Sequence, residues 1–187
     1  MNNQIQNRSF IKKIILALGC AVVLGGVFLY YQAMRQSDIM GYDPARDRQQ
    51  IFTLFRNHWK WLVTSSDYPM EYVFDELSPE PDNPAYLGKM KVSVLRQGDK
   101  LIGFITYYMQ SETVGRILFL AIDESAWGKR YGQQLIQYSI KQLQAMGAKT
   151  LRIFVYKGNE KALKLYHRIG FRKIQDAGIG FMMQYIP

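Results

Sequence analysis

The chain has 187 residues, with 24 Lys and Arg against 15 Asp and Glu, and one cysteine. This length suffices for one domain with a substantial core. A single cysteine excludes an internal disulfide, and with two histidines it is too few ligands for a zinc module, so we expect no metal. Apolar content of 48% excludes a disordered chain, and the net charge of +9 favours an anionic partner: nucleic acid, a membrane surface or a phosphorylated ligand.

An uncharged run, residues 14–34, follows a short basic N-terminal tail at residues 1–13. As a helix rising about 1.5 Å per residue, this run is long enough to cross a bilayer. A cleaved signal peptide is the alternative, but the run ends in Tyr-Tyr-Gln-Ala-Met and offers no clean cleavage site. We therefore predict a retained single-pass transmembrane helix. The flanking charges leave its orientation open, since the basic residues are Arg8, Lys12 and Lys13 on one side and Arg35, Arg46 and Arg48 on the other.

Residues 35–187 are predicted to form one domain whose first half holds two helices and a hairpin. Apolar residues recur at helical spacing in the first helix. The turn Gln-Gly-Asp-Lys joins two apolar strands, and three prolines mark a loop before them. The predicted elements in chain order are a linker or first strand (39–42), helices 46–63 and 70–77, a loop at 78–84, and strands 91–96 and 101–108.

The second half alternates strands with helices and closes on two strands. Gly147 and Gly170 are predicted to end the two helices, because glycine readily adopts the left-handed conformation found after a helix. The predicted elements are strand 116–122, helix 132–146, strand 150–156, helix 159–169, and strands 171–175 and 179–186.

A basic loop with two glycines, residues 124–132 (ESAWGKRYG), opens the first of these helices. Such a loop directs several backbone N–H groups at one point above the helix N-terminus, which favours an anion. Gly128 and Gly132 allow the backbone to approach a ligand, and Lys129 and Arg130 add charge. An ordinary strand-to-helix turn is the alternative, and the loop alone does not decide between them.

The segment Asn159–Phe171 (NEKALKLYHRIGF) forms the second informative stretch. Asn159 begins a predicted helix, and Tyr166 lies two turns along it. Each has an ordinary interpretation, since Asn159 can cap the helix with its side chain and Tyr166 can be a core residue. Neither residue indicates a function by itself.

Together, the strand, the basic loop, the helix, the next strand and the pattern N-x-x-A-x-x-L-Y-x-x-x-G-F resemble the GNAT superfamily of N-acetyltransferases. The resemblance covers roughly residues 39–187 and implies an α/β fold, in which a mostly antiparallel, twisted central sheet is flanked by helices. The loop departs from the family pattern Arg/Gln-x-x-Gly-x-Gly/Ala. Trp127 stands in place of Arg/Gln, and Arg130 stands in place of the first glycine.

The resemblance implies acetyl-CoA as donor and a primary amine that attacks the thioester directly in a ternary complex. Strand backbone would hold the pantetheine arm like an added strand, and an N–H there would polarise the thioester carbonyl. Tyr166 would be catalytic, protonating the departing thiolate. The residues implied to bind the donor are Leu120, Ala121, Ile122, Gly128, Lys129, Arg130, Tyr131, Gly132, Gln133 and Asn159.

Charge is segregated along the chain. Residues 127–173 hold eleven Lys and Arg and one acid, which suits the phosphates of CoA. A solvated basic face or anionic lipid headgroups are alternatives, and no base-reading motif indicates nucleic acid. Residues 61–88 hold six acids and no Lys or Arg. This segment is either a solvated surface or a rim that attracts a cationic acceptor: a polyamine, a lysine side chain, a peptide N-terminus or an amino sugar.

Other titratable residues are not assigned to catalysis. Glu112 and Asp123 flank the predicted strand 116–122 and are candidates for the base that receives the proton of the amine. We expect them to be solvated carboxylates instead, so the general base is not identified. His58 and His167 are expected to be exposed. The leading hypothesis is a membrane-anchored N-acetyltransferase with its domain in the cytoplasm, where acetyl-CoA is made. The alternative is a non-catalytic membrane module of the same fold that binds CoA or recruits a partner, which Trp127 and Arg130 favour.

Overall fold

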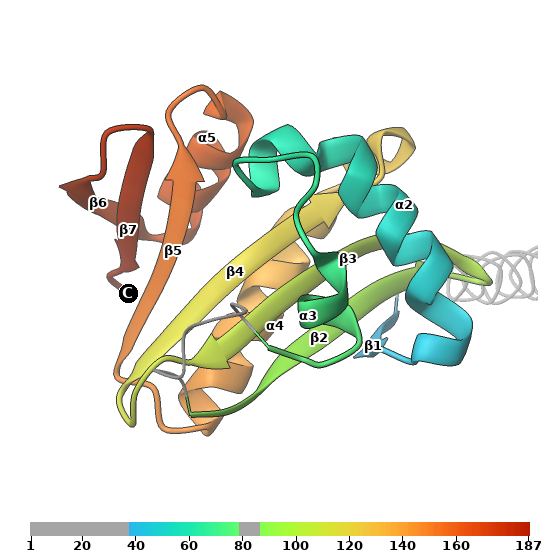
Figure 1. Ribbon diagram of the computed structural model, residues 1–187. Helices are drawn as coiled ribbons and strands as arrows, with labels where there is room; N and C mark the ends of the chain where they lie inside the picture. Colours follow the sequence, from blue (N-terminus) through green and yellow to red (C-terminus); the bar gives the residue numbers. More distant parts are fainter. Residues whose placement is uncertain (1–37, 79–86) are drawn as a thin grey trace, which may run out of the picture. The chain divides into compact units, whose positions relative to one another are not determined.

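Seven strands form one mixed sheet in the order β1-β2-β3-β4-β5-β7-β6 in the computed structural model, which describes residues 38–78 and 87–187 (Figure 1). Neighbouring strands are antiparallel except for β4 and β5, which are parallel. The predicted α/β fold with a mostly antiparallel sheet is confirmed. The strands are β1 (Asp38–Gly41), β2 (Leu87–Gln97), β3 (Lys100–Met109), β4 (Val114–Ile122), β5 (Thr150–Tyr156), β6 (Phe171–Asp176) and β7 (Gly180–Tyr185).

Helices cover both faces of this sheet. In Figure 1, α2 (Pro44–Leu62) and α3 (Met70–Phe74) lie on one face, and α4 (Tyr131–Ala145) lies on the other. The side chains of α5 (Glu160–Ile169) join the same buried cluster as those of α4. Local sequence sets the helix ends, since the Asp43 side chain accepts from the Ala45 N–H, 3.0 Å away, and Gly170 ends α5 with a φ of +117°.

The predicted helices and strands are all present, with two differences in extent. β2 begins at Leu87 because its pairing with β3 continues to Met109, beyond the run of apolar residues. The second helix stops at Phe74, after which Leu77 has a φ of +54°. The tail, the run 14–34 and residues 79–84 of the predicted loop lie outside the described residues. Within 38–78 and 87–187, no helix is long and apolar enough to cross a membrane.

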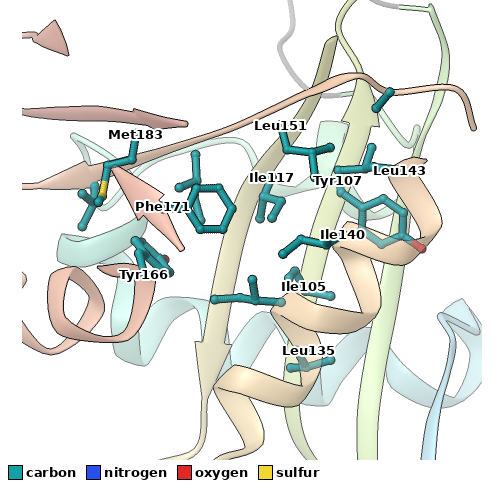
Figure 2. Packing of buried hydrophobic residues seen from close by; sticks show 14 of the residues in the cluster. Ile105, Tyr107, Ile117, Leu135, Ile140, Leu143, Leu151, Tyr166, Phe171 and Met183 are labelled. Atoms are coloured by element: carbon teal, nitrogen blue, oxygen red, sulfur yellow. The ribbon is translucent and has the colours of Figure 1, made fainter. Parts of the chain in front are cut away.

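Two hydrophobic clusters hold the layers together. One lies between the sheet and the pair α4 and α5, and Figure 2 shows Tyr166 beside Phe171 and Met183 at one end of it and Leu143 beside Tyr107 at the other. The second lies between the sheet and the pair α2 and α3, and its largest fully buried side chains are Phe55, Phe74 and Phe104.

β4 contains a bulge, and its pairing with β5 ends next to it. Ile117 pairs with Tyr107 and Phe119 pairs with Thr106, so Leu118 is the extra residue. The parallel pairing with β5 ends at Ile117 and Ile153, although the two strands continue to Ile122 and Tyr156. The strands therefore diverge, as Figure 1 shows, and the edge of β4 beyond the bulge has no strand partner on that side.

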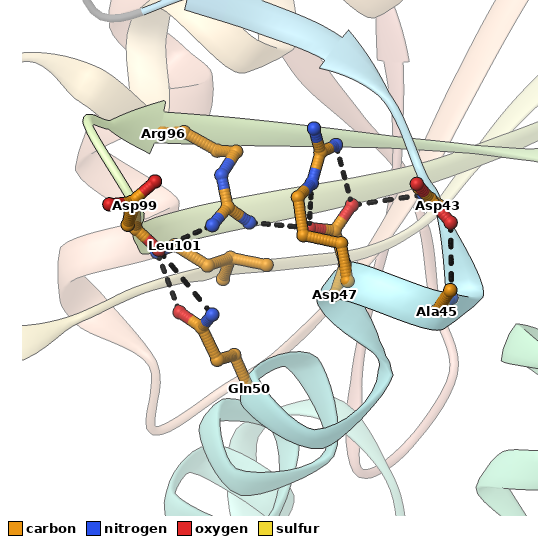
Figure 3. A network of polar contacts seen from close by, with 8 residues as sticks. Asp43, Ala45, Asp47, Gln50, Arg96, Asp99 and Leu101 are labelled. Carbon is orange, nitrogen blue, oxygen red and sulfur yellow. Dashed lines mark hydrogen bonds and ion pairs between the residues drawn. The ribbon is translucent and has the colours of Figure 1, made fainter.

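A buried ion pair ties α2 to the β2–β3 hairpin (Figure 3). The Asp47 side chain is 0% exposed and accepts from the guanidinium of Arg96, which is 5% exposed and also donates to the Asp99 carbonyl. Arg46 and the Asp43 N–H, each 2.9 Å away, donate to the same carboxylate. Burial would raise the pKa of Asp47, but these hydrogen bonds and the two positive charges outweigh it and hold that pKa below its ordinary value.

Candidate active site

A cavity of about 770 Å³ lies between the diverging strands. Its walls come from β4, β5, the loop after β4, the first turn of α4, α5, and the last turn of α2. The structure brings together every site residue expected from the sequence except Lys129, whose exposed side chain does not line the cavity. The expected residues that do line it are Leu120, Ala121, Ile122, Gly128, Arg130, Tyr131, Gly132, Gln133, Asn159 and Tyr166.

Backbone groups of β4 face the cavity at alternate residues. The Asp123 N–H donates to the Ile102 carbonyl of β3, 2.9 Å away. Because strand backbone alternates in direction, Ala121 also turns its N–H and C=O toward β3, whereas Leu120 and Ile122 turn theirs toward the cavity. The edge that the sequence predicted for an extended ligand therefore consists of Leu120 and Ile122, and Ala121 contributes its side chain.

The N-terminus of α4 opens on the same cavity without a cap. Arg130 precedes the helix, adopts the left-handed conformation with a φ of +64°, and makes no side-chain hydrogen bond to the first turn. The first N–H groups of any helix lack partners within the helix, and the helix dipole makes this end positive. The first turn of α4 contains no acid, so this end of the cavity attracts an anion.

Glycine at position 132 lets this first turn approach β4 and α5 closely. A Cβ atom there would lie 3.2 Å from a methyl group of Leu165 and within 4 Å of side-chain atoms of Ile122 and Leu120. A larger residue would therefore push the helix N-terminus away from the strand edge. Gly132 keeps the two backbone features of the cavity next to each other.

Tyr166 lines the cavity with 6% of its surface exposed. Its ring contacts that of Phe171, with 6.1 Å between the centroids. Its hydroxyl makes no hydrogen bond to any described residue. Burial raises the pKa of Tyr166 far above its ordinary value, so the phenol stays protonated at neutral pH and is available as a proton donor.

Asn159 caps α5 and lines the cavity. Its Oδ1 accepts from the Ala162 N–H at 3.1 Å, as the ordinary interpretation of this residue predicted. Oδ1 is therefore engaged in the protein, and the side-chain NH₂ group is the part of Asn159 that remains for a ligand.

Trp127 makes contacts that the sequence did not predict. Its indole N–H donates to the Ile122 carbonyl at 2.9 Å, on the strand edge that faces the cavity. The Lys161 ammonium lies 3.9 Å from the centre of the indole ring, and the His58 ring centroid lies 6.0 Å away. The indole thus links α2, β4 and α5 across the cavity.

The prediction that His58 is exposed is wrong. Only 8% of its surface is exposed, because it lies on the same face of α2 as Phe55 and lines the cavity. Burial lowers the pKa of His58 despite the nearby charges of Glu124 and Asp123, so its imidazole is neutral at neutral pH. His167 is exposed, as predicted.

The charged residues that line the cavity are mostly basic. Among the described residues the only acid in the lining is Glu160, and Asp75, from the acidic segment, is bound instead by Arg48 at 2.7 Å. Glu112 is exposed, and Asp123 accepts from Ser125 and pairs with Lys100 at 3.3 Å. The cationic lining residues are Arg116, Arg130, Lys161 and Arg168, and all but Arg116 belong to the basic segment 127–173.

The fold of this chain is similar to that of solved acetyltransferase structures. The PaiA N-acetyltransferase from Thermoplasma acidophilum, solved in complex with coenzyme A, has 20% sequence identity and a TM-score of 0.67, with 81% of this chain and 99% of that chain covered. A GCN5-related N-acetyltransferase from Kribbella flavida has 18% identity and a TM-score of 0.63, with coverage of 80% and 96%. These similarities establish the fold.

The sequence also matches curated relatives. The chain is 27% identical over 140 residues to a mycothiol acetyltransferase from Actinosynnema mirum, covering 72% of this chain and 44% of that protein. It is 29% identical over 87 residues to a mycothiol acetyltransferase from Mycobacteroides abscessus, covering 45% and 29%. The chain thus spans less than half the length of these relatives.

The family model for the acetyltransferase (GNAT) family matches residues 49–171, which include β4, the basic loop, α4, β5 and α5. This match extends over more than half of the chain and contains every residue expected at the site. With the shared fold, it shows that the chain belongs to the acetyltransferase (GNAT) family.

Proposed function

We propose that this domain transfers the acetyl group of acetyl-CoA to a primary amine by direct attack in a ternary complex. The observation that carries the proposal is one cavity that contains both an unpaired strand edge, at Leu120 and Ile122, and the uncapped N-terminus of α4. An edge that can bind amides and a helix end that can bind a diphosphate match the two parts of CoA that lie beyond its thioester.

The residues of the chain divide the binding task. The N–H groups of Tyr131, Gly132 and Gln133 and the Arg130 side chain receive the diphosphate. Leu120 and Ile122 receive the amide groups of the pantetheine arm. The indole N–H of Trp127 already occupies the Ile122 carbonyl, so the arm must displace it or bind beside it.

When bound, acetyl-CoA supplies a thioester whose carbonyl carbon forms a C–N bond with the amine while its C–S bond breaks and the thiolate leaves. An N–H on the cavity edge of β4 stabilises the oxyanion that develops. Tyr166 gives its hydroxyl proton to the departing sulfur and regains one from solvent. The new amide nitrogen loses its extra proton to solvent, so protons balance.

A second candidate function is a non-catalytic module that holds CoA or recruits a partner. The indole hydrogen bond to Ile122 favours it, because that bond blocks one acceptor of the strand edge. The Tyr166 hydroxyl, which bonds to no described residue although Tyr166 lines the cavity, favours catalysis instead.

Calorimetry and thiol release distinguish these two functions. We expect acetyl-CoA to bind the full chain with micromolar to millimolar affinity and an amine to release free thiol. Arg130→Gln should weaken acetyl-CoA binding severalfold, because it removes a charge from the cavity, whereas Lys149→Gln, the same change on an exposed residue, should not. Binding without thiol release across a panel of amines would support a module that holds CoA. Absence of binding would contradict the catalytic function and leave only a module that recruits a partner.

We also propose that residues 14–34 anchor the enzyme in a membrane with its catalytic domain in the cytoplasm. The support is in the sequence alone: this uncharged run spans about 30 Å as a helix and is flanked by basic residues. The full chain should sediment with membranes and resist extraction at high pH, whereas a variant with Leu16→Arg and Leu24→Arg should become extractable. A protease added to the outside of unbroken cells should not cleave the domain. Cleavage from outside would reverse the proposed orientation.

A further inference from the structure

Two arginines lie side by side on β4 and β5. Arg116 of β4 and Arg152 of β5 are register partners in the short parallel stretch that joins the two strands. Neighbouring strands are about 5 Å apart, so two positive charges stand together just before the strands diverge. Arg116 lines the cavity.

Both side chains project from the face of the sheet that carries α2. Tyr108, the β3 partner of Arg116, belongs to the cluster beneath α2, and register partners point to the same face. Ile117 and Ile153, which follow the two arginines, belong to the cluster beneath α4. Since side chains alternate along a strand, the arginines point away from α4 and its anion-attracting end.

Neither arginine has a protein partner in the part of the chain that the structure describes. The Nε–H group of each is shielded from solvent and donates to no described oxygen. Neither side chain forms an ion pair with a described residue. The other arginines near strands differ, since Arg96 binds Asp47 and Arg172 donates to two carbonyls. Both side chains are half-buried, and two adjacent positive charges that each hold an unbonded, shielded Nε–H favour the binding of an anion.

We propose that Arg116 and Arg152 bind an anionic group of the acceptor, so that the substrate is an amine that also carries a carboxylate or a phosphate. Two guanidinium groups match the oxygens of either group with paired hydrogen bonds. At about 3.3 Å per residue, Leu118 and Leu120 lie roughly 7 and 13 Å along β4 from Arg116. A small molecule can therefore bridge the arginines and the reacting edge. This proposal rests on the proposed function.

Nuclear magnetic resonance of the arginine Nε–H groups tests the site without requiring turnover. In the full chain, two Nε–H resonances, assigned through Arg116→Lys and Arg152→Lys, should shift saturably when inorganic phosphate or acetate is added, with or without CoA. The Nε–H resonance of Arg56, exposed on α2, is the matched control and should not shift saturably. If the Arg116 and Arg152 resonances move no more than that of Arg56, no anion site exists and the inference is wrong.

Acceptor preference supplies the second arm. Thiol release should favour an amino acid over its amide, or phosphoethanolamine over ethanolamine, by about tenfold or more, the factor that a charge-assisted hydrogen bond provides. Arg116→Lys and Arg152→Lys should reduce that preference by raising KM for the anionic acceptor, while their affinity for acetyl-CoA stays unchanged. The control variant Arg56→Lys should keep the full preference. Turnover of neutral amines with equal efficiency would overturn the inference and leave the proposed function intact. Absence of thiol release would instead overturn the proposed function, and the resonance shifts would still decide the anion site.

Discussion

Tyr166→Phe is expected to lower kcat by roughly 100-fold or more while KM for acetyl-CoA stays nearly constant, because general acid catalysis typically contributes a factor of 10²–10⁴. The change removes one oxygen and keeps the ring that packs against Phe171. The oxygen bonds to no described residue, so its loss leaves no protein group unpaired. Steady-state kinetics with a saturating amine measure the effect.

Thermal unfolding separates a chemical role of Tyr166 from a structural one. The Phe variant should unfold within a few degrees of the parent chain, and calorimetry should show unchanged acetyl-CoA affinity. A loss of kcat together with unaltered unfolding and unaltered acetyl-CoA affinity would support the acid role. An unchanged kcat would show that solvent, rather than Tyr166, protonates the leaving sulfur.

Arg96→Met is expected to destabilise the domain by about 3 kcal/mol, the lower end of the range for breaking a buried ion pair, because Arg46 still binds Asp47. For a domain of this size, that change lowers Tm by roughly 6–12 °C. Urea unfolding followed by fluorescence measures the difference. Arg48→Met is the matched control, since its ion pair with Asp75 is exposed and should contribute less than about 1 kcal/mol.

The pH dependence of this destabilisation has a definite sign. The folded-state pKa of Asp47 lies below its ordinary value, so the stability from its ionised form is present above the unfolded pKa and is lost as pH falls through the folded pKa. The difference between parent and Arg96→Met should therefore shrink in acid. Equal destabilisation at neutral and acidic pH would show that Arg96 stabilises by packing and by its hydrogen bond to the Asp99 carbonyl, not by its ion pair with Asp47.

Local signals in the sequence were sufficient for most of the secondary structure. Gly170 after a helical repeat and Gln-Gly-Asp-Lys between two apolar runs act through a few neighbouring residues, and each predicted boundary lies close to the observed one. The start of β2 and the bulge at Leu118 depend on strands that pair over long sequence separations. No periodicity within one segment contains that information.

The site divides in the same way. The sequence patterns predicted lining residues on β4, in the loop before α4 and from Asn159 to Tyr166. They predicted none on α2 or β5, which only the fold brings to the cavity. His58 was misjudged, although its spacing of three from Phe55 was a usable signal for burial. The pairing of Arg116 with Arg152 could not be predicted, because it depends on the register between two parallel strands. Each strand by itself shows only one charge in an apolar run.

The divergence of β4 from β5 also bears on how the protein avoids self-association. An unpaired strand edge on a protein surface is a template on which other chains add, and natural proteins shield such edges with charge, bulges or covering segments. Here the free edge at Leu120 and Ile122 lies inside a cavity whose walls include Trp127, Tyr166 and the first turn of α4. The indole N–H of Trp127 also pairs with the Ile122 carbonyl, which leaves another chain one fewer acceptor on this edge. The geometry that reserves this edge for a small ligand thus also protects the protein from aggregation through it.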